Sequence, residues 1–296
     1  MRTTFDAVFV GAATQDALAL VSGFPRPDQR MVADAIAHAG GGPAATAAVA
    51  AARLGMHVAF VGTVGDDVDG QSILAGLTAE GVDVSGVSVR RGHASAVSVV
   101  VVDAVHGTRA ICNRPGPDIE LTAGRALLAA APVVHVDHVG WGPVTEAFPN
   151  VGPRLSVDAG NPIPGFTQAG VRLFVPTVEA LRSDSGLMDV DDLLVQAIAG
   201  GCDIVVATDG ANGSYARTST GQAAFAPAHR VEIVSTLGAG DVFHGALIAS
   251  EIHGLPLEQR LIFANAAAAL ACRGLDGRST IPRLPEVMSF LPAPVR

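Results

Sequence analysis

The 296-residue sequence contains no lysine, so all 19 of its Lys and Arg residues are arginines. Pyridoxal phosphate enzymes and Schiff-base aldolases need a lysine amine, and its absence excludes both classes. It also excludes a Walker A loop, in which a lysine contacts the nucleotide phosphates. Any phosphate that this chain binds must be held by arginine, by a metal ion or by backbone N–H groups.

Cysteine, basic clusters and long apolar runs are also scarce. The three cysteines are far apart and in no metal-binding spacing, which predicts small core residues rather than a disulfide or a zinc site. A net charge of −9, with no basic cluster larger than Arg90-Arg91, argues against nucleic acid or an anionic membrane as a partner. No apolar run is long enough to span a bilayer and the first residues have no signal-peptide core, so we expect a cytoplasmic protein.

Aliphatic residues are abundant, and they are arranged in alternating strand-like and helix-like segments. A hydrophobic content of 49% and a mean hydropathy of +0.40 predict a large core rather than disorder. The alternation predicts an α/β fold, with a parallel sheet covered by helices on both faces. Three strand-like segments without helices between them predict a second, smaller sheet: Met31–His38, Ser95–Asp103 and Arg109–Asn113.

The most informative segment joins a glycine-rich turn to a carboxylate. Val231–Val234 is expected to end a strand, Gly238-Ala239-Gly240 forms the turn, and an apolar helix is expected to open at Asp241. Free N–H groups at a helix start bind phosphate, and glycine lets the backbone approach it closely. Asp241 could then take a proton from a hydroxyl that attacks the phosphate. The same residues would also suit an ordinary helix start, with Asp241 complementing the dipole.

A second glycine-rich segment, 40–46, runs into an alanine-rich helix that closes at Gly55. Together the two segments resemble the ribokinase-like (PfkB) family of carbohydrate and nucleoside kinases, whose hallmarks are GG…N/T-x-A…LG and DTxGAGD. Thr208–Gly213 matches the family's T-x-G-x-x-G nucleotide turn, and Asn265–Pro282 matches its last helix and the following loop. The resemblance implies a ribokinase-like three-layer sandwich with a mostly parallel central sheet.

The resemblance also implies how the chain is organised. One kinase domain would span residues 1–296, with a β lid formed by about 12–40 and 93–116. A three-stranded lid sheet left uncovered would be a liability, which predicts a homodimer joined through the lid.

The activity implied by the resemblance is transfer of the γ-phosphate of ATP, with Mg²⁺, to a primary hydroxyl of a sugar or sugar derivative. Asp241 would be the catalytic base, and Gly238, Ala239 and Gly240 would supply the N–H groups that hold the phosphoryl. The resemblance assigns substrate binding to a set of residues from both ends of the chain: Asp16, Arg30, Gly41, Gly42, Thr46, Asn113 and Asp241. It assigns nucleotide binding to another set: Thr208, Gly210, Gly213, Gly238, Gly240 and Asn265.

This chain departs from the family pattern at two places, and both concern metal ions. Ser235 replaces the first aspartate of DTxGAGD, which together with the loop near Ser279 would hold a monovalent cation, so K⁺ activation is in doubt. Glu179 stands one residue out of register with the family's N-x-x-E motif, which helps to place Mg²⁺.

The substrate is the least determined part of this interpretation. The motifs are most similar to the sulfofructose kinase branch, in which Arg30 and Asn113 fall at sulfonate-binding positions, but an arginine expected before Trp141 is Gly140. A neutral sugar or another acidic sugar stays open. A nucleoside kinase and a non-catalytic sugar or nucleotide sensor on the same fold are the alternatives, whereas a nicotinamide dehydrogenase would need a G-x-G-x-x-G motif that Gly11–Thr14 does not provide.

Overall fold

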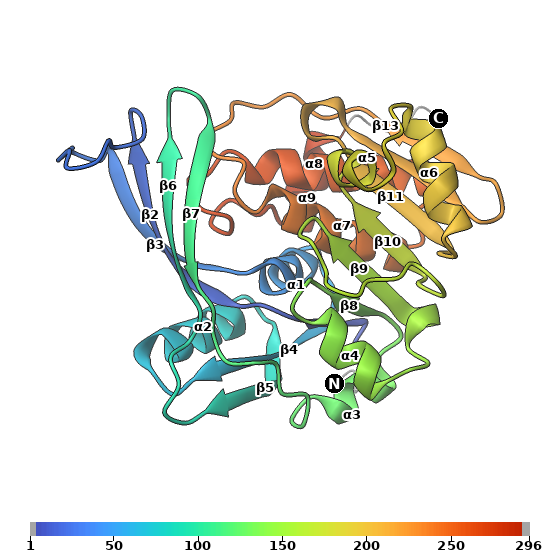
Figure 1. Ribbon diagram of the computed structural model, residues 1–296, viewed down its shortest axis with the longest axis horizontal. Helices are drawn as coiled ribbons and strands as arrows, with labels where there is room; N and C mark the ends of the chain where they lie inside the picture. Colours follow the sequence, from blue (N-terminus) through green and yellow to red (C-terminus); the bar gives the residue numbers. More distant parts are fainter. Residues whose placement is uncertain (1–3, 292–296) are drawn as a thin grey trace.

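The computed structural model describes residues 4–291, and within them the strands form two sheets (Figure 1). The larger sheet has nine strands in the order β13-β12-β11-β10-β9-β8-β1-β4-β5 across the described residues. Its strands are β1 (Ala7–Val10), β4 (Val58–Gly65), β5 (Asp83–Arg90), β8 (Val134–Val136), β9 (Leu155–Ala159), β10 (Leu173–Pro176), β11 (Ile204–Thr208), β12 (Ser214–Thr218) and β13 (Ala223–Ala226). Neighbouring strands from β5 to β11 are parallel, and β12 and β13 add an antiparallel edge.

Helices cover both faces of this sheet because its central strands are apolar on both sides. Every residue of β1, β8 and β10 is buried. One core cluster packs beneath α1 (Pro43–Arg53), α2 (Val68–Ala79), α7 (Ala239–Ile252), α8 (Leu257–Ala271) and α9 (Leu284–Phe290). The other packs beneath α3 (Arg125–Ala130), α4 (Trp141–Ala147), α5 (Val178–Ser185) and α6 (Val190–Ala199). These layers confirm the predicted three-layer α/β fold.

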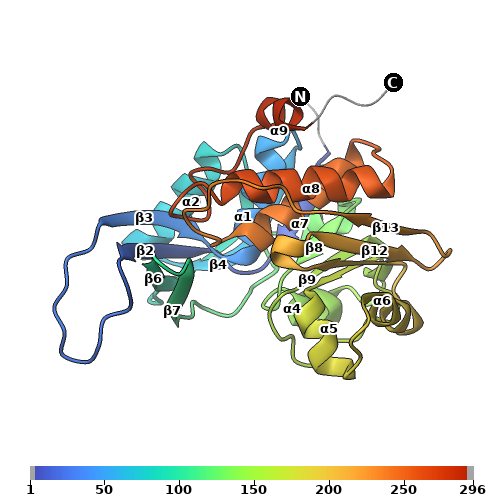
Figure 2. The same cartoon turned by 90° about the horizontal axis from the view of Figure 1, so that it is seen from above.

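The smaller sheet, called the lid sheet here, has the strand order β3-β2-β6-β7 within the described residues. Its strands are β2 (Thr14–Val21), β3 (Ala35–Gly41), β6 (Val97–Asp103) and β7 (Thr108–Arg114). It stands beside the main body, and the loop between β2 and β3 projects outward from it (Figure 2). Three strands were expected, and β2, which pairs with both β3 and β6, was missed because its Asp16, Ala17 and Ala19 are residue types that are uncommon in strands.

Two further details differ from expectation. Val231–Val234 joins no strand; instead the N–H groups of Val234 and Ser235 donate to the Cys272 carbonyl at 2.9 and 3.2 Å. Helix α7 begins at Ala239, before Asp241, because Gly238 adopts a left-handed turn with φ 73°. Cys202 and Cys272 are buried as expected, whereas Cys112 is exposed on β7.

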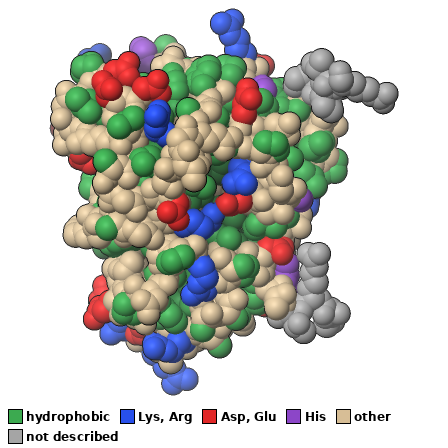
Figure 3. All heavy atoms as spheres, turned by 90° about the vertical axis from the view of Figure 1, so that its right-hand side faces the viewer, with side chains coloured by type: hydrophobic (Ala, Val, Ile, Leu, Met, Phe, Trp, Pro, Cys, Tyr) green, Lys and Arg blue, Asp and Glu red, His purple; other side chains and the backbone are tan. Residues whose placement is uncertain are grey.

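On the face opposite the lid sheet, arginine side chains are scattered among acidic and hydrophobic ones (Figure 3). Over residues 4–291, none of the helices combines the length and the apolar character that crossing a bilayer requires.

Candidate active site

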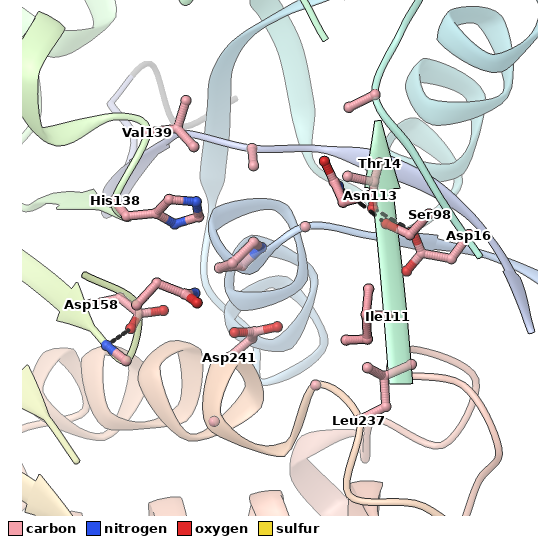
Figure 4. Close-up of a pocket in the computed structure, with 18 of the residues that line it drawn as sticks. Thr14, Asp16, Ser98, Ile111, Asn113, His138, Val139, Asp158, Leu237 and Asp241 are labelled. Carbon is pink, nitrogen blue, oxygen red and sulfur yellow. Dashed lines mark hydrogen bonds between the residues drawn. The ribbon is translucent and has the colours of Figure 1, made fainter. Parts of the chain in front are cut away.

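A cavity of about 610 Å³ lies between the lid sheet and the carboxyl ends of the large sheet's strands. Ligands of α/β proteins bind in this position, beyond the carboxyl ends of parallel strands. Figure 4 shows Thr14, Asp16, Ser98, Ile111 and Asn113 on the lid side and His138, Val139 and Asp158 on the other, with Leu237 and Asp241 below them.

The start of α7 forms part of the cavity wall through Gly238, Gly240 and Asp241. Within an α-helix the first N–H groups have no intrahelical acceptor, which leaves those of Gly240 and Asp241 for a ligand. We call these two groups the amide cradle. The N–H of Ala239, which was also expected to hold phosphate, donates to the Thr236 carbonyl at 3.3 Å.

The Asp241 carboxyl is half-buried in the cavity wall and close to other charged groups. Burial and then the charge of Asp158 raise its pKa to about 7, while the charges of His244 and Arg278 act in the opposite direction. A carboxylate with a pKa near neutral pH can accept a proton from a hydroxyl. The free amides at the helix start beside it can hold anionic charge at the same time.

Asp16 presents its carboxylate to the cavity from β2, and Oδ1 accepts a hydrogen bond from Thr14 Oγ1 at 2.6 Å. Burial raises its pKa, opposed by hydrogen bonds from Thr14 and Ser98 and by the charge of Arg278. The backbone of Gly41 runs so close that a Cβ there would lie 2.0 Å from Asp16 Oδ2, so only glycine fits. The carboxylate oxygens suit the donor hydroxyls of a diol.

Arg278, buried beneath this wall, was not singled out by the sequence analysis as a site residue. Its Nη2 donates to the Gly41 carbonyl at 2.6 Å and its Nε to Thr46 Oγ1 at 3.3 Å. Burial lowers its pKa to about 10, which the charges of Asp16 and Asp241 oppose, so it stays a cation. Thr46, expected to bind substrate, therefore contacts this guanidinium and is absent from the residues that line the cavity.

Asp137 fixes the loops around the cavity floor. Its two oxygens accept four backbone N–H groups, from Ala12 at 2.7 Å, Ala44 at 3.3 Å, and Val139 and Gly140 at 2.9 Å each. One carboxylate thus joins the loops that follow β1 and β8 to the start of α1.

Two further polar contacts at the cavity were also missed. His244 Nε2 lies 3.1 Å from Asp158 Oδ1, and both side chains are buried. Arg109 Nη1, on the lid strand β7, donates to Thr236 Oγ1 at 2.9 Å, just before the amide cradle. Among the described residues that line the cavity, Arg109 is the one arginine.

Some expected binding residues reach the cavity and others do not. Gly42, Asn113 and Thr208 line it, and Asn113 Nδ2 donates to Ser98 Oγ at 3.3 Å. Arg30 is exposed in the loop between β2 and β3, and the structure does not bring it to the cavity wall.

Of the expected nucleotide residues, Thr208, Gly238 and Gly240 line the cavity, and the other three lie outside it. Gly210 and Gly213 belong to the turn after β11 and do not line the cavity. Asn265 is buried on α8, where its Nδ2 donates to the carbonyls of Ala226 and Pro227 at 3.0 and 3.1 Å. Their role in nucleotide binding stays a prediction.

None of the three expected metal-binding residues is among those that line this cavity. Glu179 lines an adjoining cavity of about 500 Å³, which shares Asn161 and Thr177 with the first. Ser235 is buried and its Oγ accepts the Leu237 N–H at 3.2 Å. Ser279 N donates to Asp276 Oδ1 at 2.6 Å.

Two of the missed residues had signals in the sequence. His244 follows Asp241 by one helical turn, so it shares a face of α7 with it. Asp158 lies near the carboxyl end of β9, where ligand-binding residues gather in such sheets. Nothing in the sequence could have paired Arg278 with Gly41, since the two residues meet only through the fold.

Comparison with known proteins finds matches over most of the chain. The family model described as "pfkB family carbohydrate kinase" matches residues 4–148 and 169–284. An ATP-dependent ribose-1-phosphate kinase from Halopiger xanaduensis is 28% identical over 300 residues, covering 95% of this chain and 96% of that protein.

Solved structures show the same fold. A putative ribokinase from Agrobacterium tumefaciens is 26% identical with a TM-score of 0.86, covering 97% of each chain. A putative ribokinase II from E. coli, solved with ATP and Mg²⁺, has a TM-score of 0.77 at 20% identity, covering 97% of this chain and 98% of that one.

Proposed function

The chain belongs to the pfkB family of carbohydrate kinases, and from this premise we propose that it transfers the γ-phosphate of ATP to a primary hydroxyl of a sugar or sugar derivative. Membership makes it a sugar kinase, a phosphotransferase with a hydroxyl acceptor. The observation that carries the proposal is the Asp241 carboxyl, with a pKa of about 7, in a cavity wall beside the free amides of the α7 start.

In the proposed reaction Asp16 accepts hydrogen bonds from sugar hydroxyls and orients the ring. Asp241 takes the proton of the attacking hydroxyl, whose oxygen forms a bond to the γ-phosphorus. The bond from phosphorus to the bridging oxygen breaks, and ADP leaves with that electron pair. The amide cradle holds the charge on the transferring phosphoryl.

We place the nucleotide along Thr208, Gly210 and Gly213, with the adenine near Asn265. Mg²⁺ would arrive with the nucleotide phosphates and polarise them, as the E. coli relative bound to ATP and Mg²⁺ supports. Oxygen donors suit this ion, and the Glu179 carboxylate in the adjoining cavity is the side chain that we assign to it.

A monovalent cation has weaker support. Ser235 and Ser279 offer neutral oxygens where the family resemblance implies a charged one, so we propose that activity depends little on K⁺. Equal turnover in potassium and tetramethylammonium buffers is the expected result.

The proposed substrates are ketoses and sulfosugar-like molecules. Asn113 on the cavity wall supports a polar contact to a distal substituent, whereas Arg30 is too exposed to support a sulfonate contact in this structure. A thermal-shift panel of sugars, sulfosugars and nucleosides with a non-hydrolysable ATP analogue identifies the substrate, because bound ligand stabilises the fold by mass action.

The decisive experiment is Asp241→Asn. We expect turnover to fall by roughly 10²- to 10⁴-fold or more, with binding of the ATP analogue retained, because the variant lacks the proton acceptor. Asp69→Asn is the matched control, since Asp69 is the first-turn aspartate of α2 and does not line the cavity. Equal behaviour of the two variants would mean that Asp241 only complements its helix dipole, and would leave a sugar or nucleotide sensor as the better interpretation.

We also propose a homodimer through the outer face of the lid sheet. Residues alternate between the two faces of a strand. Because Asp16 and Val100 face the cavity, the residues next to them in β2 and β6 face away from it. This outer face carries Ala17, Ala19, Ile36, Val99 and Val101, with His38 among them, and Ile36 is 72% and Val99 54% exposed. Sedimentation of the wild type should give a dimer and that of Val99→Glu a monomer; a monomeric wild type at micromolar concentration contradicts the proposal.

A further inference from the structure

His244 lies one helical turn after Asp241 on α7 and is held by Asp158 from the end of β9. The His244 Nε2 to Asp158 Oδ1 distance is 3.1 Å, and each side chain is only 6% exposed. Asp158 Oδ1 also accepts the Gly160 N–H at 2.8 Å, which fixes the carboxylate in place. The other ring nitrogen of His244, Nδ1, is buried without a hydrogen-bond partner among residues 4–291.

The pair stands in a cavity that is rich in negative charge. Asp16, Asp118, Asp158 and Asp241 all line it, whereas Arg109 is the only arginine among the described lining residues. A kinase must bring the phosphates of a nucleotide into this space, and a chain without lysine has few cations to meet them.

The surroundings of His244 favour the charged imidazolium. Burial by itself lowers the pKa of this imidazole, but the charge and hydrogen bond of Asp158, with the charge of Asp241, raise it above its ordinary value. Burial likewise raises the pKa of Asp158, yet His244 brings it well below its usual range. An imidazolium and a carboxylate at this distance form a buried ion pair.

A second buried histidine nearby shows that a histidine in this core is charged only with a carboxylate partner. His135 on β8 is fully buried, with its ring 5.4 Å from that of His244, and its Nδ1 lies 3.1 Å from Ser156 Oγ. With no carboxylate bonded to it, burial and then the charge of His244 lower its pKa to about 3. His135 is therefore neutral.

We propose that His244 is a positioning residue for phosphoryl transfer: Asp158 holds it as a cation, and this cation keeps Asp241 ionised as the proton acceptor. The inference rests on the proposed function, in which Asp241 is the base. The other charged groups that face Asp241 are Asp137, which disfavours its ionisation, and Arg278, which favours it.

The proposal makes an unusual prediction about charge. Asp158 alone would be an anion beside Asp241 and would make its ionisation harder, whereas Asp158 and His244 together are nearly neutral. Removing His244 alone should thus hinder the ionisation of Asp241 more than removing both members of the pair. If the role of the pair were purely structural, the double variant should be the more impaired of the two, since each substitution would add its own destabilisation.

The test is the pH profile of kcat/KM in His244→Asn and in the double variant Asp158→Asn/His244→Asn. We expect the acid limb of His244→Asn to move upward by about 1 to 3 pH units, because a neighbouring cation is lost. The acid limb of the double variant should return most of the way to that of the wild type. The proposal is overturned if the acid limb of His244→Asn stays at the pH of the wild type. It is also overturned if the acid limb of the double variant lies at a pH as high as that of the single variant.

A second measurement needs neither a variant nor activity. The ring of His244 in the wild-type protein can be titrated by NMR, assigned through its helix neighbours. We expect it to be protonated at pH 7 and the ring of His135 to be neutral there; a neutral His244 at pH 7 refutes the inference even if the variants do not fold. An active Asp241→Asn enzyme would instead refute the proposed function, so the two failures can be told apart.

Discussion

Gly240 offers a test that separates the amide cradle from the stability of the fold. It is the second residue of α7, its φ is not in the left-handed region, and a Cβ built on it meets no atom within 4 Å. It also lines the cavity. Gly240→Ala should therefore place a methyl group in the space meant for the phosphoryl, without straining the protein.

The two expected effects have opposite signs. Replacing a helical glycine by alanine stabilises a helix by up to about 1 kcal/mol, which corresponds to a rise in Tm of about 2–4 °C for a protein near this size. In contrast, a phosphoryl pushed off the cradle loses an amide donor, and the loss of one such donor costs about 10²- to 10³-fold in kcat. The variant should be more stable and much less active.

Gly76→Ala is the matched control, because Gly76 lies inside α2 and a Cβ there also meets nothing within 4 Å. It should gain similar stability and keep full activity, since Gly76 does not line the cavity. The assay is ADP formation with the sugar identified by the thermal-shift panel, together with thermal unfolding. Wild-type kcat in a folded Gly240→Ala enzyme would show that the cradle does not hold the phosphoryl.

Three further predictions concern charged residues at the cavity or directly behind its wall. Because the pKa of Asp241 is about 7 and only the ionised form accepts a proton, kcat/KM should fall about tenfold for each pH unit below that value; a flat profile from pH 8 to pH 5 would contradict its role as base. Arg109→Gln should lower kcat on the order of 100-fold, because it removes a cation from above the phosphoryl. Thr236→Val breaks the 2.9 Å hydrogen bond between Arg109 and Thr236 but keeps the charge, so it should retain most activity in the same assay. Arg278→Met removes the 2.6 Å bond to the Gly41 carbonyl, so denaturant unfolding should show a loss of about 2 kcal/mol and steady-state kinetics a raised KM for the sugar, with the KM for ATP nearly unchanged.

Local chemistry made part of the site predictable. The Gly238–Gly240 turn and Asp241 are contiguous in the chain, and the glycines at 40–42 directly precede α1. Each segment therefore indicates a glycine-rich helix start from residue types alone, and the first also indicates anion binding. The alternation of strand-like and helix-like segments similarly predicted the layered sheet, because each element must bury its own apolar face.

Pairings between distant segments could not be predicted in this way. Strand β2 was missed because its own residue types do not favour a strand, whereas its pairing with β3 on one side and with the distant β6 on the other makes it one. The ion pair of Asp158 with His244 is another such case, as is the bond of Arg278 to Gly41.

The sequence by itself determined the class of fold, the phosphate-binding turn and the carboxylate beside it, since these depend on residues that are neighbours along the chain. Only the tertiary structure decided the charge around that carboxylate, because burial and the approach of Asp158, His244 and Arg278 set its pKa. Electrostatic energies depend on distance in space and on exclusion of water, and neither is written in the order of the residues.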